Sequence, residues 1–381
     1  RGLCDGCIID LLSGALVHQS NGEVVVADDG PRRLRGCEYV LPTDGTAEIH
    51  VPVRSLLAHR PQIVTSFRLN VARAHDPLCQ SVRIEPLEWQ QRPLTVARLC
   101  ETIARRDDRS IPVEASPQLQ EAVLSAVESL NLEMEYRGEN WLLGPCQRSK
   151  PTFGVAVDIG TTTVAVVVAD LETGDVVASA SALNAQSHVG DNVLTRINKC
   201  MADATMIRTL QQAIVDDTLG PLVGQAVRSA NLKLDQITCF VIAGNTTMLH
   251  LLVGENPASM GVAPFTPTFL DYQCFPTEEF ELFVPADSEA DDQGQSEDEV
   301  ANSLARNGEA CQATIHLLPG AAAYVGADIT AGVLASGMAY RDDTCLLVDL
   351  GTNGEIVLRH QDVLIGCATA AGPAFEGAGL T

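Results

Sequence analysis

The stretch FGVAVDIGTTTVAVVVADLETGDVVASASAL, Phe153–Leu183, decides how the second half of this chain folds. An apolar strand, Val155–Val157, runs directly into an aspartate, a glycine and three threonines, and two further apolar runs follow, separated by a turn at LETGD. The same order recurs in CLLVDLGTNGEIVLRHQDVLIGCATA, Cys345–Ala370. Internal duplication of this kind is a signal at the level of the fold. It predicts two similar α/β lobes, each built on a three-strand unit flanked by helices, which face a cleft.

The residues after each first strand suit an anion. A tight turn of glycine and threonine lets backbone N–H groups approach phosphate closely. Asp158 and Asp349 would repel phosphate directly, but they can hold a hydrated Mg²⁺ or orient an attacking water. The chain has only three lysines, none of which follows a glycine, so a Gly-Lys-Ser/Thr phosphate loop is excluded. One such motif alone could be a polar strand end, whereas two in matching context favour a polyphosphate clamp.

Charge and composition exclude several classes of partner. A net charge of −24 argues against nucleic acid and against anionic membrane surfaces. We find no apolar run long enough to span a bilayer in the sequence. The acidic stretch ADSEADDQGQSEDEV, Ala286–Val300, is typical of a solvated loop, and its spacing does not supply a calcium site. Most of the twelve cysteines are scattered singly, which predicts a reducing cytoplasm.

The chain of 381 residues divides into three predicted regions. Residues 1–58 are rich in short β-like runs, including EVVVADDG and TAEIHVPV, with Asp44-Gly45 as a hairpin turn. Residues 59–150 form a linker and a small middle domain with one helix, Pro117–Leu130, capped by Ser116. Residues 151–381 follow an α/β pattern.

Within the α/β region, helices are predicted inside 191–201 and 206–230. The strand ITCFVIAG leads into a helix that opens at Asn245. After the acidic loop, ATIHLLPG is a predicted strand and YVGADITAGVLASG a predicted helix. Asn245 and Thr246 are explained as well by a helix cap as by a ligand role.

Three cysteines near the start have the spacing of ligands. Cys4 and Cys7 are separated by two residues, and Cys37 follows at a distance. This spacing fits the second, third and fourth ligands of a plant-type [2Fe–2S] cluster, whose first ligand we expect before residue 1. A zinc knuckle would need a further nearby ligand, a thioredoxin-type pair needs a βαβ setting, and three unrelated core cysteines stay open as an alternative.

Beyond these patterns, DIGTTT and DLGTNGE resemble the two phosphate motifs of the actin, Hsp70 and sugar-kinase (ASKHA) superfamily, whose lobes are RNase H-like. A narrower resemblance is to the ATP-dependent reductive activators of corrinoid proteins. It is carried by VAVDIGTTTVAVVVADLETG, AGNTTMLHLLVG, GVAPF, LLPGAAAYVGADITAGVLASG, LLVDLGTNGEIVL and ATAAGPAFEGAG. The resemblance covers about residues 153–381. Because that family continues beyond the equivalent of Thr381, we expect a fragment that lacks the adenosine-binding segment as well as the first cluster ligand.

The resemblance implies the following roles. Residues expected at phosphate and Mg²⁺ are Asp158, Gly160, Thr161, Thr162 and Thr163; the opposing loop is Asp349, Gly351, Thr352, Asn353 and Gly354; and Gly372 starts a helix near the nucleotide. The two aspartates would be catalytic. The family also carries a ferredoxin-like N-terminal domain, which assigns Cys4, Cys7 and Cys37 to a [2Fe–2S] cluster.

The implied activity is ATP-dependent transfer of an electron from the [2Fe–2S] cluster to Co(II) in a corrinoid protein of a methyltransferase system, which regenerates Co(I). An upstream reductase or other electron donor would reload the cluster. Two alternatives stay open. One is a phosphotransferase of the sugar-kinase type, which leaves the cysteine region unexplained. The other is a non-catalytic ferredoxin-like electron carrier, which predicts no ATP turnover.

Overall fold

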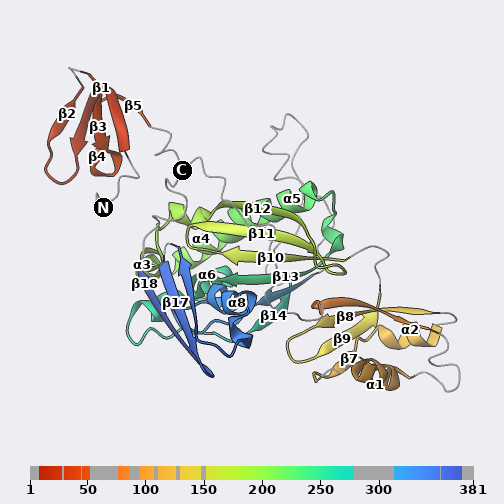
Figure 1. Ribbon diagram of the computed structural model, residues 1–381. Coiled ribbons are helices and arrows are strands. Elements are labelled where there is room, and N and C mark those ends of the chain that lie inside the picture. Colours follow the sequence, from red (N-terminus) through yellow and green to blue (C-terminus); the bar gives the residue numbers. More distant parts are fainter. Residues whose placement is uncertain are drawn as a thin grey trace, which may run out of the picture. The chain divides into compact units, whose positions relative to one another are not determined.

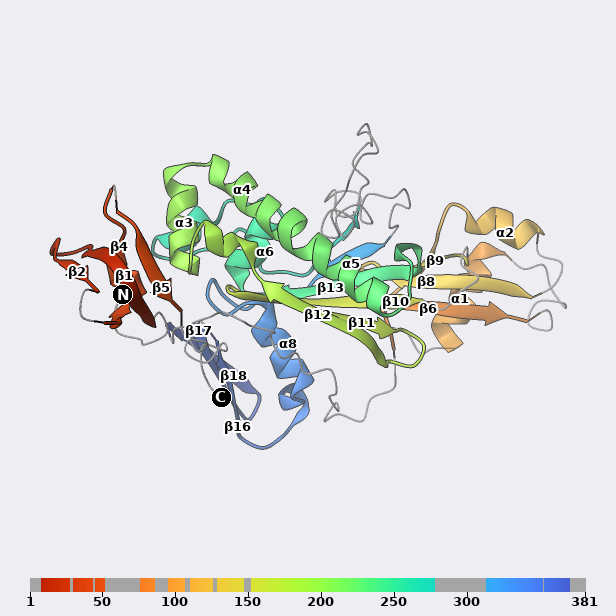
Figure 2. The same cartoon turned by 90° about the horizontal axis from the view of Figure 1, so that it is seen from above.

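The computed structural model describes residues 8–27, 30–43, 45–51, 76–85, 95–106, 110–125, 129–146, 152–277, 313–351 and 353–370. The chain forms two compact units, shown from two directions in Figures 1 and 2. One unit comprises Arg1–Gln62, Val348–Ile356 and Ala368–Thr381, and the other comprises Ile63–Leu347 and Val357–Cys367. Each is described by itself.

The N-terminal sheet is organised around one long strand, β1 (Ile8–His18). Its antiparallel partners are β2 (Val24–Val26), β3 (Arg32–Arg35), β4 (Tyr39–Val40) and β5 (Ala47–His50). The hairpin predicted at Asp44-Gly45 would pair the strands on either side of that turn. In the described residues these strands, β4 and β5, each pair with β1 instead. Asp44 itself lies outside the described residues.

The middle region has an α+β fold, in which two helices pack on a small sheet. Its four-stranded sheet has the order β6 (Cys79–Ile84), β8 (Leu130–Tyr136), β9 (Trp141–Pro145) and β7 (Val113–Ala115). Helices α1 (Val96–Arg106) and α2 (Leu119–Ser125) supply the other half of its core. Leu99 and Ile103 from α1 pack with Leu132 and Met134 from β8, and all four are buried.

The helix predicted over Pro117–Leu130 was too long. The structure places α2 over Leu119–Ser125 and starts β8 at Leu130. Along β8 the buried residues Leu130, Leu132 and Met134 alternate with more exposed ones, which is the period of two of a strand. The strand pairs with β6. The cap was also wrong, because the Ser116 Oγ is buried without a hydrogen-bond partner in the described part of the chain.

The large sheet of the second unit has the order β12 (Val176–Leu183), β11 (Thr163–Asp170), β10 (Phe153–Ile159), β13 (Ile237–Gly244), β15 (Thr314–Leu317) and β14 (Gln273–Pro276). Strands β10, β11 and β12 form the predicted run of antiparallel neighbours, whereas β10, β13 and β15 are mutually parallel. The helices between the strands are α3 (Val193–Ala202), α4 (Thr205–Ile214), α5 (Gly220–Ser229) and α6 (Thr246–Leu252). A π-helical turn, Val215–Leu219, joins α4 to α5.

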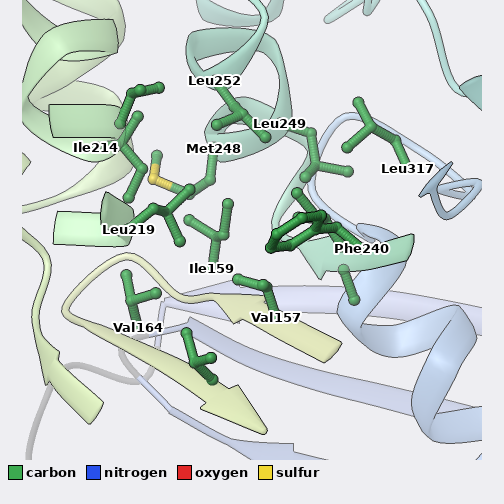
Figure 3. Close-up of a cluster of buried hydrophobic side chains, with 14 of the residues drawn as sticks. Val157, Ile159, Val164, Ile214, Leu219, Phe240, Met248, Leu249, Leu252 and Leu317 are labelled. Carbon is green, nitrogen blue, oxygen red and sulfur yellow. The ribbon is translucent and has the colours of Figure 1, made fainter. Parts of the chain in front are cut away.

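One face of this sheet carries the core (Figure 3). Val157 and Ile159 from β10 and Val164 from β11 point toward side chains of the helical layer, including Ile214, Leu219, Met248, Leu249 and Leu252. The intervening β10 residues, Ala156 and Asp158, are exposed. Strict alternation along the strand therefore puts Asp158 on the face opposite this core.

The three-strand unit recurs, as predicted, at the end of the described chain. The strands β16 (Cys345–Leu350), β17 (Asn353–His360) and β18 (Val363–Ala370) follow one another in the sheet in that order. Helix α8 (Ala327–Ala335) precedes them, and its buried Ile329 and Val333 cluster with Val357 of β17. Among the described helices, none has the length and apolarity needed to cross a bilayer.

Candidate functional site

The first predicted phosphate motif is a tight turn between β10 and β11. The Gly160 N–H donates to the Thr163 carbonyl oxygen at 3.0 Å, which closes the turn. A Cβ atom at Gly160 would lie 2.6 Å from that same oxygen, so the turn requires glycine. Thr161 is buried, whereas Thr162 and Thr163 are half-buried. The structure thus brings the predicted residues of the first motif together on one turn.

The carbonyl groups of this turn are tied back to the protein. The Asn184 amide Nδ2 donates to the Gly160 oxygen at 2.9 Å, and the Asn184 backbone N–H donates to the Thr162 oxygen at 2.8 Å. The Arg196 Nη2 donates to the Thr161 oxygen at 2.6 Å. In a trans peptide the N–H points opposite to the C=O. The N–H groups of Thr161, Thr162 and Thr163 are therefore turned away from the groups that hold the carbonyls, as an anion-binding turn requires.

A second turn lies at the same edge of the sheet, because β10 and β13 are parallel and Ile159 is opposite Gly244. A Cβ at Gly244 would lie 2.7 Å from the Ile159 oxygen, so the two backbones are in close approach. Asn245 caps α6, since its side chain accepts from the Thr247 N–H at 3.0 Å. The Thr246 hydroxyl donates to the Ala322 oxygen at 2.7 Å. Both side chains are thus used within the protein, which supports the helix-cap interpretation.

Gly326 also belongs to this edge, and the sequence did not single it out. It is the N-cap residue of α8. A Cβ there would lie 2.5 Å from the Gly244 oxygen and 2.7 Å from the Asn245 Cα. The start of α8 therefore touches the β13–α6 turn through backbone atoms. The sequence analysis placed Gly326 inside the predicted helix YVGADITAGVLASG, whereas the structure starts α8 at Ala327, and nothing in that stretch indicates which backbone the glycine meets.

The second predicted motif forms the turn between β16 and β17. The Gly351 N–H donates to the Asn353 oxygen at 3.1 Å. Asp349 is exposed near the end of β16, and Gly354 is buried. Thr352 and Gly372 lie outside the described residues. This turn and Asp158 fall in different compact units, so the expectation that the two motifs face each other stays a prediction.

The predicted cluster ligands are described only in part. Cys37 lies half-buried in a 3₁₀ turn, Gly36–Glu38. Cys4 and Cys7 lie outside the described residues. Across the part of the chain that the structure describes, no three His, Cys, Asp or Glu side chains are grouped to hold a metal. The assignment of the three cysteines to one cluster stays a prediction.

Comparison with known proteins agrees with the motifs. Residues 153–290 match the family model of the RACo middle region, and residues 343–381 match that of the C-terminal domain of RACo, the ASKHA domain. The corrinoid activation enzyme RamQ of Eubacterium limosum is 31% identical over 235 residues. In these regions the chain is similar to reductive activators of corrinoid proteins.

A solved structure extends the similarity to the N-terminal part of the chain. The structure of a reductive activator for corrinoid, iron-sulfur protein is similar over 100% of this chain, with a TM-score of 0.65 and 28% identity. The chain spans 59% of that structure and 35% of RamQ, whereas the match to RamQ covers 62% of this chain. The homologous chains are therefore longer than the sequence in hand.

Proposed function

We propose that this chain is part of an ATP-dependent activator that passes one electron to the Co(II) form of a corrinoid protein and so regenerates Co(I). The observation that carries the proposal is the Gly160–Thr163 turn, where Asn184 and Arg196 hold the carbonyl oxygens of Gly160, Thr161 and Thr162, so that the N–H groups in the same peptide planes point away from those two residues. Such a turn binds phosphate oxygens without a lysine. The homologues are named as activators, which favours this function over a phosphotransferase or a passive electron carrier.

Asp158 and Asp349 would act at the triphosphate. Asp158 is exposed at the carboxyl end of β10, on the sheet face opposite the apolar core. A carboxylate in that place, two residues before Gly160, fits the preference of Mg²⁺ for oxygen ligands and can hold the ion through its waters. Asp349 stands two residues before Gly351 in the second motif. We infer that both aspartates hold Mg²⁺ or orient water, while the turns bind phosphate oxygens.

The N-terminal sheet would carry the electron source. Cys37 offers a thiol at a turn of this sheet, and the solved activator is similar over the whole chain. We infer that Cys37 is a ligand of a [2Fe–2S] cluster together with Cys4 and Cys7. Such a cluster, when bound, supplies single electrons at low potential. An upstream reductase would reload it, and the free thiols of the described cysteines suit the cytoplasm that we predict.

The test uses the full-length protein and its corrinoid partner. We expect the absorption change from Co(II) to Co(I) to require Mg²⁺ and ATP, with the reduced cluster as electron donor. Reduction of equal rate and extent without ATP would remove the proposal.

Variants should then separate the two halves of the activity. Asp158→Asn or Asp349→Asn should abolish ATP-driven reduction while the visible spectrum of the cluster is kept. Cys37→Ser should abolish the cluster spectrum while ATP binding is kept. If Asp158→Asn and Cys37→Ser both leave reduction unchanged, the residue assignment is wrong.

A further inference from the structure

Arg196 on α3 is a fully buried arginine, with 0% of its side chain exposed. Its Nε donates to the Gly190 oxygen at 2.9 Å, and its Nη1 donates to the Gln186 Oε1 at 3.0 Å. Its Nη2 donates to the Thr161 oxygen of the phosphate turn at 2.6 Å. The Met248 sulfur lies 2.9 Å from Nη1. The guanidinium thus bonds three separate oxygen acceptors through three different nitrogens of a rigid plane, a geometry that the single ammonium nitrogen of lysine does not reproduce.

Within the described residues, no carboxylate oxygen lies at ion-pair distance from the Arg196 guanidinium, although Asp191 favours the charged form. Burial lowers the pKa of Arg196 to about 10, so it stays protonated at neutral pH. A buried charge is costly unless it is paired and hydrogen-bonded. The acceptors that the structure describes around the Arg196 guanidinium are neutral. Its positive potential is therefore available to an anion beside the turn.

Arg196, Gln186 and Asn184 form a set of hydrogen-bonded side chains behind the turn, which we call the frame. The Gln186 Nε2 donates to the Leu210 oxygen of α4 at 2.8 Å, and the Gln186 backbone N–H donates to the Asn184 Oδ1 at 3.0 Å. Asn184 is itself fully buried and holds the Gly160 oxygen. Rotation of the peptide planes of the turn would therefore break bonds to Arg196 and Asn184 together. This frame fixes which way the N–H groups of the turn point.

We propose that Arg196 is a positioning residue that holds the Gly160–Thr163 turn in its phosphate-binding shape and places a positive charge behind it. The inference rests on the proposed function, because it assumes that this turn receives the phosphates of ATP. A residue that merely joins α3 to the rest of the core would affect stability, but it would not act selectively on the phosphate part of a ligand.

The test compares the affinities of full-length protein for Mg–ATP and for adenosine by calorimetry. Arg196→Gln should weaken Mg–ATP binding at least tenfold and change adenosine affinity less than twofold. Arg196→Lys restores the charge without the fork, so it should weaken Mg–ATP about threefold. The matched control is Gln211→Ala, which removes another side-chain bond to a helix carbonyl, at Leu252 (3.0 Å), and should leave both affinities unchanged.

A second readout does not depend on ligand. Amide hydrogen exchange of the 160–163 turn should speed up in Arg196→Gln and not in Gln211→Ala. Equal loss of ATP and adenosine affinity, or ATP binding within twofold of wild type, would overturn the inference. If Arg196→Gln does not fold, the inference is tested on Arg196→Lys by comparing its loss of Mg–ATP affinity with its loss of adenosine affinity. Absence of ATP binding in the wild type would instead refute the proposed function.

Discussion

Replacement of Asn184 by alanine tests the frame behind the phosphate turn most directly. The side chain is fully buried, and its two shortest bonds run from Nδ2 to the Gly160 oxygen at 2.9 Å and to Oδ1 from the Gln186 N–H at 3.0 Å; alanine removes both. The bond from the Gln186 N–H caps the 3₁₀ helix Ala185–His188 and contributes about 1 kcal/mol. The bond to the Gly160 oxygen contributes about 1 kcal/mol. Leaving the Gly160 oxygen and the Gln186 N–H without these partners costs roughly 1 kcal/mol more. We therefore expect the free energy of unfolding to fall by about 3 kcal/mol.

The chain offers a matched control in Asn256. Its side chain makes the same type of cap, accepting from the Ala258 N–H at 3.0 Å, but it is exposed and makes no second bond. Asn256→Ala should therefore lower the free energy of unfolding by only about 1 kcal/mol. The bond from the Asn184 backbone N–H to the Thr162 oxygen survives in both variants.

Thermal unfolding of the full-length protein, followed by circular dichroism, measures the difference. In the large unit, Ile63–Leu347 with Val357–Cys367, a gap of about 2 kcal/mol corresponds to a midpoint roughly 3 °C lower for Asn184→Ala than for Asn256→Ala. Coincidence of the two midpoints within about 1 °C would show that Asn184 does no more than cap a turn, and the argument that it holds Gly160 would fail.

Two further predictions concern the same unit. Gly326→Ala places a Cβ 2.5 Å from the Gly244 oxygen, so it should cost about 1–3 kcal/mol of stability and weaken Mg–ATP binding. Gly332→Ala in the same helix meets only an ordinary contact at 3.5 Å and should be neutral or stabilising; equal effects would contradict the predicted close approach. Burial, reinforced by the Arg137 charge, lowers the pKa of His316 from 6.5 to about 4. The unfolded chain therefore takes up this proton first, and the free energy of unfolding should fall as pH drops from about 6.5 to about 4. Urea unfolding of His316→Gln should show a smaller fall than wild type over that range, and an identical slope would contradict the assignment.

Local patterns determined much of the fold. The repeated apolar–Asp–Gly–Thr order predicted both three-strand units, and β10, β11 and β12 pair as expected. The helix predicted to open at Asn245 is α6, and of the two roles left open for Asn245 the structure shows the cap. These features depend on the period of two along strands and on bonds between residues a few positions apart, which are visible in a sequence. The predicted end of this helix was wrong at Leu130, which belongs to β8. A leucine there fits the apolar spacing of a helix and the alternation of a strand, so the sequence pattern could not separate the two.

Tertiary structure alone decided what surrounds the phosphate turn. Arg196 and Gly160–Thr163 are far apart in the sequence, and nothing in VLTRINKCMA marks its arginine as a buried partner of Thr161. Gly326 meets Gly244 only because α8 begins beside the carboxyl end of β13. The sequence by itself determined the candidate residues, since glycine and threonine suit a phosphate and aspartate suits Mg²⁺ wherever they stand. Which distant side chains hold that turn was settled by the order of strands in the sheet, because strand order brings remote backbones into contact.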